Sequence, residues 1–234
     1  MVPAPGKVDL SSLPAPVRRY LARVLPNRPG SENARAVRLR QTGEMMLRPG
    51  VRPRRFTATE ELAADRVEFS WRARFPMLGP LTMRVTDAYA AGEGLLEVRV
   101  LGLPVQRKRG PQLAQGEAFR YLAELAWAPQ AILANPELEW SELDDRAAEV
   151  ATHAGGRRIA LRLTFNAAQE IAQTEALRPR IEAGGTPTTW IGTYHDYRAF
   201  GPMIAPARGE VRWELPDGPF TYWRGTISSL ELHR

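Results

Sequence analysis

Residues 117–133 read EAFRYLAELAWAPQAIL, and this stretch decides the fold class that the sequence predicts. At about 100° per residue, its apolar side chains cover well over half of the circumference of a helix. These side chains are Phe119, Leu122, Ala123, Leu125, Ala126 and Trp127. A helix with so wide an apolar surface must be mostly buried. We therefore predict one central helix over residues 116–133, broken near Ala128 because Pro129 removes a helical hydrogen bond.

Apolar residues on both sides of this helix recur with a period of two, which predicts β-strands. The clearest strand is 66–75, where Val67, Phe69, Trp71, Ala73 and Phe75 alternate with polar residues. The others span 36–47, 81–85, 96–100, 148–152, 159–165, 171–176, 188–200, 211–215 and 220–232, with a bulge at Gly43. A sheet with one apolar face buries that face most completely by curving around the apolar helix. The predicted fold is mainly β (α+β): a strongly curved antiparallel sheet or unclosed barrel of about ten strands around one central helix.

The length of 234 residues suits a single domain. We expect residues 1–33 to form a short N-terminal helix and its connector, and residues 34–234 to form the curved sheet with its central helix. Ser11 or Ser12 is the expected helix cap, and the helix should end before Pro26. Its apolar face, formed by Val17, Tyr20, Leu21 and Val24, predicts a lid or plug docked on the sheet.

Composition excludes several classes of function. The chain has no cysteine, so disulfides, thiolate nucleophiles and cysteine-based zinc sites are excluded. No GxSxG, Walker, dinucleotide-binding or HExxH motif occurs, and we expect no cofactor. A metal site is not expected either, because His153, His195 and His233 would all have to converge. The first 16 residues lack a basic-then-apolar run, so we expect neither a signal peptide nor a transmembrane segment, and a cytoplasmic location.

The net charge of +6 and the pI near 10.1 raise the question of nucleic-acid binding. The arginines are scattered among 26 acidic residues, and the chain has no basic helix or binding-module signature. We therefore do not expect a nucleic-acid partner. His195 and Asp196 lie side by side in sequence, but on one strand they would point to opposite faces and could not pair.

The central helix has one narrow polar stripe, formed by Glu117, Arg120, Tyr121 and Glu124 at i, i+3, i+4 and i+7. One interpretation is a solvent-exposed row of ion pairs, each worth a few tenths of a kcal/mol. The other is a stripe that faces a cavity, where a carboxylate with a raised pKa and a tyrosine perform acid-base chemistry or orient a polar head group. The sequence leaves both open.

Three functional hypotheses follow. The first is binding of an apolar or amphipathic, lipid-like small molecule on the concave face of the sheet. Its candidate residues are the polar stripe (Glu117, Arg120, Tyr121, Glu124) and two tryptophans, Trp71 and Trp127, which line a pocket or belong to the core. The second is an enzyme that uses Glu117 or Glu124 as general acid or base, with Tyr121 and Arg120 as polarising partners. The third is a structural or partner-binding protein without a pocket.

Four motifs carry a resemblance to a known family. They are LPAPVRRYLARVL (13–25), FSWRARF (69–75), VTDAY followed by GEG (85–94) and, above all, EAFRYLAELAWAPQAIL. Together they resemble an uncharacterised bacterial domain family along most of the chain. The resemblance implies no established activity. The overall shape that it implies is similar to the unclosed-barrel proteins that carry lipoproteins or lipids between bacterial membranes. Those carriers are exported, and the missing export signal argues against a membrane-shuttle role.

Overall fold

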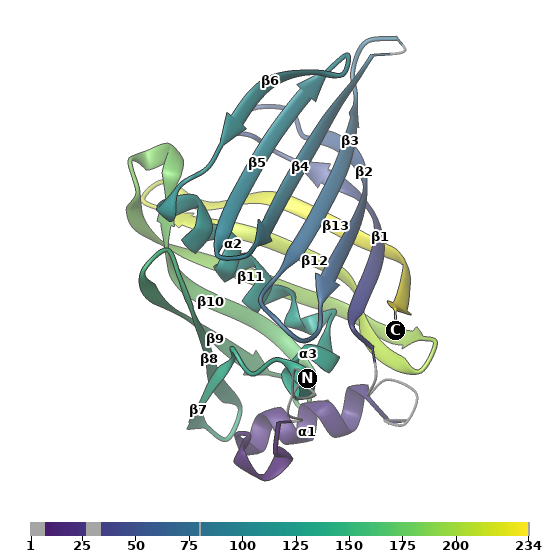
Figure 1. Cartoon of the computed structure of the whole chain (residues 1–234), viewed down its shortest axis with the longest axis vertical. Coiled ribbons are helices and arrows are strands. Elements are labelled where there is room, and N and C mark those ends of the chain that lie inside the picture. The colour runs from purple at the N-terminus through teal and green to yellow at the C-terminus, as the bar shows by residue number, and fades with distance from the viewer. Residues whose placement is uncertain (1–7, 27–33, 80, 234) are drawn as a thin grey trace, which may run out of the picture.

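The computed structural model describes residues 8–26, 34–79 and 81–233. Within them, thirteen strands form one antiparallel sheet in the order β6-β5-β4-β3-β2-β1-β13-β12-β11-β10-β9-β8-β7. The sheet curves around helix α2 (Figure 1). The strands are β1 Ala36–Met45, β2 Arg54–Ala63, β3 Phe69–Pro76, β4 Thr82–Ala90, β5 Glu93–Val100, β6 Leu103–Lys108, β7 Glu139–Asp144, β8 Ala147–Ala154, β9 Arg157–Phe165, β10 Ile171–Arg180, β11 Thr186–Phe200, β12 Met203–Leu215 and β13 Gly218–His233.

The curved, mainly β architecture is confirmed, but the expected count of about ten strands is wrong because β2, β6 and β7 were missed. Strands β6 and β7 are the two edges of the sheet, and nearly all their residues are exposed. An edge strand has little apolar pattern to detect. In strand β2 buried and exposed side chains alternate, but two of the buried positions hold small Ala58 and charged Glu60. Large apolar residues therefore do not recur at every second position, and the sequence pattern is hidden.

The central helical segment begins earlier than predicted and is broken as predicted. Helix α2 spans Pro111–Ala123, a 3-10 turn η3 spans Glu124–Ala126, and α3 spans Pro129–Ala134. The start is five residues earlier than expected because Pro111 occupies the first helical turn after Gly110, a position where proline costs no hydrogen bond. Pro129 starts α3 in the same way. Helix α2 packs against β5 on one side and against β8, β9 and β10 on the other.

The N-terminal helix α1 (Ala15–Val24) closes one end of the sheet (Figure 1). The predicted face of Val17, Tyr20, Leu21 and Val24 is buried, and α1 packs against β8 and β12. The expected serine cap is wrong. Ser11 and Ser12 belong to a separate 3-10 turn, η1 (Leu10–Ser12), which is capped by the Asp9 side chain, and Pro14 precedes α1 without a side-chain cap.

A row of glycines lets two tryptophan rings lie against the sheet. Gly43, Gly225 and Gly209 pair with one another across β1, β13 and β12. A Cβ atom on Gly209 would lie 3.0 Å from the Trp127 ring, and one on Gly225 would lie 2.3 Å from the Trp223 ring. The bulge expected at Gly43 is wrong: the register of β1 shifts between Arg40 and Gln41 instead. Glycine is required at 43 for close packing.

The inner face of the sheet is fully buried at one end and only partly buried at the other. The backbone of α2 crosses β5 at Gly94, where an added Cβ would lie 2.9 Å from backbone atoms of the helix. Beyond this crossing, towards the β3–β4 and β5–β6 turns, the inward side chains are only partly buried. They include Met83 and Val85 on β4 and Val98 and Val100 on β5, which are paired across the two strands. We call this part of the inner face the open end.

Candidate functional site

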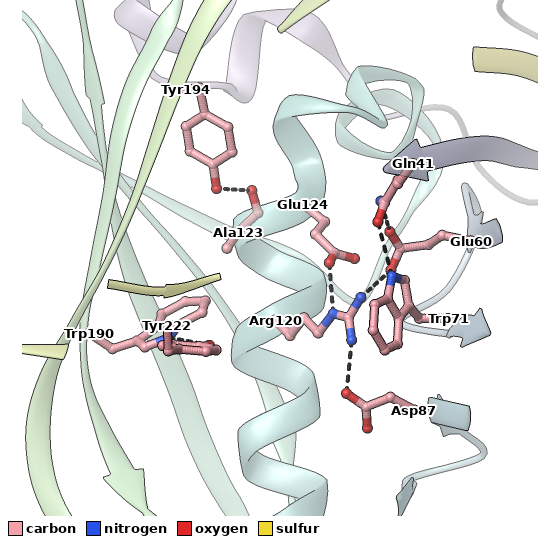
Figure 2. Close-up of polar contacts among 10 residues, drawn as sticks. All are labelled: Gln41, Glu60, Trp71, Asp87, Arg120, Ala123, Glu124, Trp190, Tyr194 and Tyr222. Atoms are coloured by element: carbon pink, nitrogen blue, oxygen red, sulfur yellow. Dashed lines mark hydrogen bonds and ion pairs between the residues drawn. The ribbon is translucent and has the colours of Figure 1, made fainter. Parts of the chain in front are cut away.

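The Arg120 side chain on α2 bonds three carboxylates from three elements (Figure 2). Its Nη2 lies 2.6 Å from Glu60 on β2, its Nη1 2.8 Å from Asp87 on β4, and its Nε 2.7 Å from Glu124. Only 17% of the Arg120 side chain is exposed. Such charge-assisted bonds are among the strongest in proteins. Arg120 therefore fastens the central helix to the β2–β4 side of the sheet.

Neutral and aromatic groups complete this ion cluster. Gln41 donates to Glu60 at 2.5 Å and accepts from the indole of Trp71 at 2.9 Å. The Arg120 guanidinium also lies over the rings of Phe69, at 4.7 Å, and Trp71, at 5.1 Å. Glu60 and Asp87 thus belong to the site as well, and no local sequence pattern indicated them because each lies alone on a strand far from α2 in sequence.

Burial of the polar stripe excludes its interpretation as a solvent-exposed row. Glu117 is 3% exposed, and Glu124 is also buried. Burial, reinforced by the nearby Asp87 carboxylate, raises the pKa of Glu117 well above its usual range. Burial likewise raises the pKa of Glu124, although Arg120 opposes that shift. Burial alone would lower the pKa of Arg120, but the surrounding carboxylates raise it above its usual value.

Tyr121 does not join this group. Its hydroxyl donates to the Ala63 carbonyl at 2.8 Å and accepts from Asn135 at 3.1 Å. Burial raises the pKa of Tyr121, which keeps its hydroxyl protonated. The structure therefore brings Arg120 and Glu124 together, as the spacing predicted, and directs Tyr121 to a structural contact with β2.

Glu117 lies between the Arg120 cluster and a second cation, Arg178 on β10. The field of both arginines acts on its carboxyl group, and its Oε2 is buried without a hydrogen-bond partner. Nε of Arg178 is buried and unpartnered too, and within the described ranges no salt bridge to Arg178 occurs. The Arg178 guanidinium lies 4.8 Å from the Trp190 ring centre and 5.8 Å from that of Trp213. Gly116 makes room for it, because a Cβ there would lie 3.0 Å from Arg178 Nη2.

Aromatic residues of β11, β12 and β13 surround Arg178. The Trp190 indole donates to the Tyr222 hydroxyl at 3.0 Å (Figure 2), and the Tyr222 ring stacks on Trp213 with centroids 6.3 Å apart. Phe220 extends this cluster, and both Phe220 and Tyr222 are partly exposed. No sequence signal pointed to Arg178, because the strand that contains it was predicted to end at Ala176.

The two candidate tryptophans are core residues. Both Trp71 and Trp127 are almost completely buried. Trp127 donates to the Pro206 carbonyl at 2.9 Å and meets Tyr194 and Trp223 edge to face. Their role is to pack the helix against the sheet, next to the charged residues.

The expectation that His195 and Asp196 point to opposite faces is wrong. Asp196 has a φ of 56° and is skipped in the pairing of β11 with β12. This irregularity turns both side chains outward, where they line an open groove of about 520 Å³ over the glycine row. Asp196 pairs there with Arg208 at 3.1 Å. The groove lies on the opposite face of the sheet from Arg120.

Neither a metal site nor a membrane-spanning helix occurs among the described residues. No cluster of three or more His, Asp or Glu side chains there is arranged to hold a metal ion. None of the helices in those ranges is long and apolar enough to cross a membrane.

Together, the fold and the site define the class: a curved, unclosed antiparallel sheet that grips a helix through a buried ion cluster. The chain belongs to DUF6544, a family of unknown function whose profile matches residues 4–225. This confirms the resemblance to an uncharacterised family. No curated protein matches the chain.

Solved structures with low sequence identity share the fold. One is a domain from Vibrio parahaemolyticus assigned as an outer membrane lipoprotein-sorting protein, with a TM-score of 0.54, 9% identity and coverage of 96% of this chain and 93% of that one. Another is a DUF1329 family protein from Desulfovibrio piger, with a TM-score of 0.50, 8% identity and coverage of 93% and 92%. A LolA superfamily protein from Nitrosomonas europaea matches with a TM-score of 0.48, 11% identity and coverage of 94% and 93%. The match to the Vibrio domain confirms the expected likeness in shape to a lipoprotein-sorting protein.

Proposed function

We propose that the protein binds an amphipathic small molecule with an acidic head group on the concave face of its sheet. The observation that carries this proposal is that Glu117 Oε2 and Arg178 Nε, both on the concave side of the sheet, are buried without a hydrogen-bond partner. Buried polar atoms without a partner are rare in proteins, and each needs a reason.

The apolar part of the ligand would lie at the open end. Met83, Val85 and Val98 face inward there and are only partly buried, and α2 crosses the sheet at Gly94, further from the turns. Burying these side chains under an alkyl chain would gain about 25 cal/mol for each Å² of apolar surface removed from water.

The charge balance favours an acidic head group. Arg120 already has three carboxylate partners, whereas Arg178 has no salt bridge within the described residues and lies against the rings of Trp190 and Trp213. Because burial raises the pKa of Glu117, the protonated form of that carboxyl can donate a hydrogen bond. A ligand carboxylate would then accept from Glu117 and pair with Arg178. The lipoprotein-sorting assignment of the Vibrio protein agrees with an apolar ligand, but only by analogy of fold.

The test uses cis-parinaric acid, a fluorescent long-chain carboxylate, and its methyl ester as an uncharged match. We expect the acid to bind more tightly than the ester. In Arg178→Met, affinity for the acid should fall about tenfold to a hundredfold, because a hydrogen-bonded charge contributes about 1.5–3 kcal/mol. Affinity for the ester should stay the same. The matched control is Arg162→Met, which removes an outward arginine from neighbouring β9.

Each outcome is decisive. If neither probe binds the wild-type protein, the binding function is wrong, and the third hypothesis, a protein without a pocket, gains support. If both probes bind equally and Arg178→Met changes neither affinity, the concave face binds apolar molecules but the head-group assignment is wrong. Thermal unfolding of each variant checks that it is folded. Native mass spectrometry of freshly purified protein adds a direct search for a co-purified acid.

The acid-base alternative keeps one supporting observation, the raised pKa of Glu117 and Glu124. It loses Tyr121 as a partner, because the hydroxyl of that residue is bonded to Ala63 and Asn135. A ligand that co-purifies in chemically altered form, and is unaltered in Glu117→Gln, would favour catalysis over binding.

A further inference from the structure

Most of the large exposed apolar side chains in the described residues lie near three turns. They are Leu47 after β1, Met77 and Leu78 after β3, and Leu101, Leu103 and Val105 at the β5–β6 turn, with Leu78 exposed to 87% and Leu101 to 71%. Elsewhere in those ranges, Leu143 and Leu177 are the only large apolar side chains that are exposed. Exposed apolar groups gathered in one region mark an interaction site more often than isolated ones do.

The topology places the three turns at the same end of the sheet. Strands β1 to β6 form an antiparallel meander, so alternate turns return to one end. The register agrees, since Phe75 pairs with Met83, Met83 with Val100, and Val100 with Leu103. In Figure 1 the β5–β6 and β3–β4 hairpins rise at the top, opposite α1. We call these turns and the adjoining strand ends the tip region (residues 44–55, 74–79, 81–84 and 99–105).

The tip region carries an excess of positive charge. It contains seven arginines against one glutamate, a balance of +6, which equals the net charge of the whole chain. The remainder of the protein therefore has no net charge. Such an asymmetry creates a field that draws an anionic partner to this end.

One row of arginines lowers the stability of the sheet. Arg74, Arg84 and Arg99 lie directly opposite one another on β3, β4 and β5, and all three are exposed. Arg99 is paired with Glu97, but within the described ranges neither Arg74 nor Arg84 has an ion-pair partner. Like charges directly opposite on neighbouring strands destabilise a sheet. An external anionic surface would neutralise them.

We infer that the tip region docks on an anionic lipid bilayer, with the apolar side chains of the turns entering the interface and the arginines on the lipid head groups. Apolar side chains combined with cationic ones are the features that membrane-surface segments use. Nucleic acid would satisfy the arginines alone, and it would leave Leu78 and Leu101 in water. The docking stands independently of the proposed function. If both hold, the open end of the concave face would meet the bilayer, and an amphipathic ligand could pass between them.

The test is co-sedimentation of the full chain with vesicles of phosphatidylcholine alone or with 30% phosphatidylglycerol, a composition chosen to give roughly the negative surface charge of an anionic membrane. We expect binding only to the anionic vesicles, weakened at high salt because the attraction of exposed charges is screened. Leu78→Ser combined with Leu101→Ser should weaken binding at least about tenfold. The matched control, Leu143→Ser combined with Leu177→Ser, removes two exposed leucines outside the tip region, 47% and 65% exposed, and should bind as the wild type does.

A second variant separates docking from folding. Arg84→Thr removes the middle charge of the row, so it should raise thermal stability slightly and still weaken vesicle binding. A merely structural role for Arg84 would move stability without changing binding. Failure of the wild type to bind anionic vesicles would overturn the inference, as would equal binding by the Leu78/Leu101 variant and its control. Tight binding of a 20-base-pair DNA duplex that is insensitive to the leucine changes, with no vesicle binding, would assign the charge to nucleic acid instead.

Discussion

Replacing Arg120 by methionine should destabilise the protein strongly, because the change leaves three carboxylates without their cation. The guanidinium bonds Glu60, Asp87 and Glu124 at 2.6, 2.8 and 2.7 Å. Breaking a buried ion pair by removing one partner costs about 3–5 kcal/mol. For a domain of this size, a loss of about 4 kcal/mol lowers the melting temperature by about 8–16 °C.

The assay is urea unfolding followed by tryptophan fluorescence, because Trp71 and Trp127 are buried close to the cluster. The loss should shrink as the pH is lowered from 8 to 5, since burial already raises the pKa of Glu124 and its protonation removes one of the stranded charges. Glu60→Gln, Asp87→Asn and Glu124→Gln, added to Arg120→Met, should restore part of the stability by removing the stranded charges.

Two results would refute this reasoning. A loss below about 1 kcal/mol would mean that the cluster contributes no more than surface ion pairs do. A loss that does not depend on pH would mean that packing, and not uncompensated charge, is responsible. Arg162→Met is the control: Arg162 is half-exposed, and its loss should cost about 0.5 kcal/mol or less.

Three further predictions concern neighbouring features. Because the pKa of Glu117 is raised, the folded state keeps a proton that the unfolded chain releases above the ordinary pKa of 4.5. Stability should therefore fall as the pH rises from 4.5 to the raised pKa. Glu117→Gln should remove this pH dependence in thermal unfolding. Gly43→Ala places a methyl group 2.1 Å from the Arg224 carbonyl oxygen, so the urea midpoint should show a loss of about 1–3 kcal/mol or more; an unchanged midpoint would contradict the close packing. Tyr121→Phe leaves the Ala63 carbonyl without its donor and should cost about 1–3 kcal/mol while leaving parinaric acid affinity unchanged; a large loss of affinity would return Tyr121 to the binding site.

The sequence predicted the parts of the fold that depend on local pattern. The apolar arc of 117–133 predicted a buried helix, and Pro129 predicted its break, because a proline ring and a missing N–H act at one position whatever the surroundings. Period-two alternation located most interior strands. It failed on β6 and β7, whose edge positions leave their side chains in water, and on β2, where Glu60 occupies an inward position.

Tertiary structure decided what the polar stripe of the central helix does. Spacing alone placed Glu117, Arg120, Tyr121 and Glu124 on one side of α2, and it predicted the Arg120–Glu124 contact. It could not predict that Glu60 and Asp87 meet Arg120 across 60 and 33 residues of sequence, or that Arg178 approaches Glu117 from β10. Such contacts depend on how far the sheet curves and on its register, which are set by the packing of thirteen strands together. The sequence by itself thus determined a buried helix with charged residues, and only the closing of the sheet around it turned those residues into a buried ion cluster, because burial is a property of the whole fold.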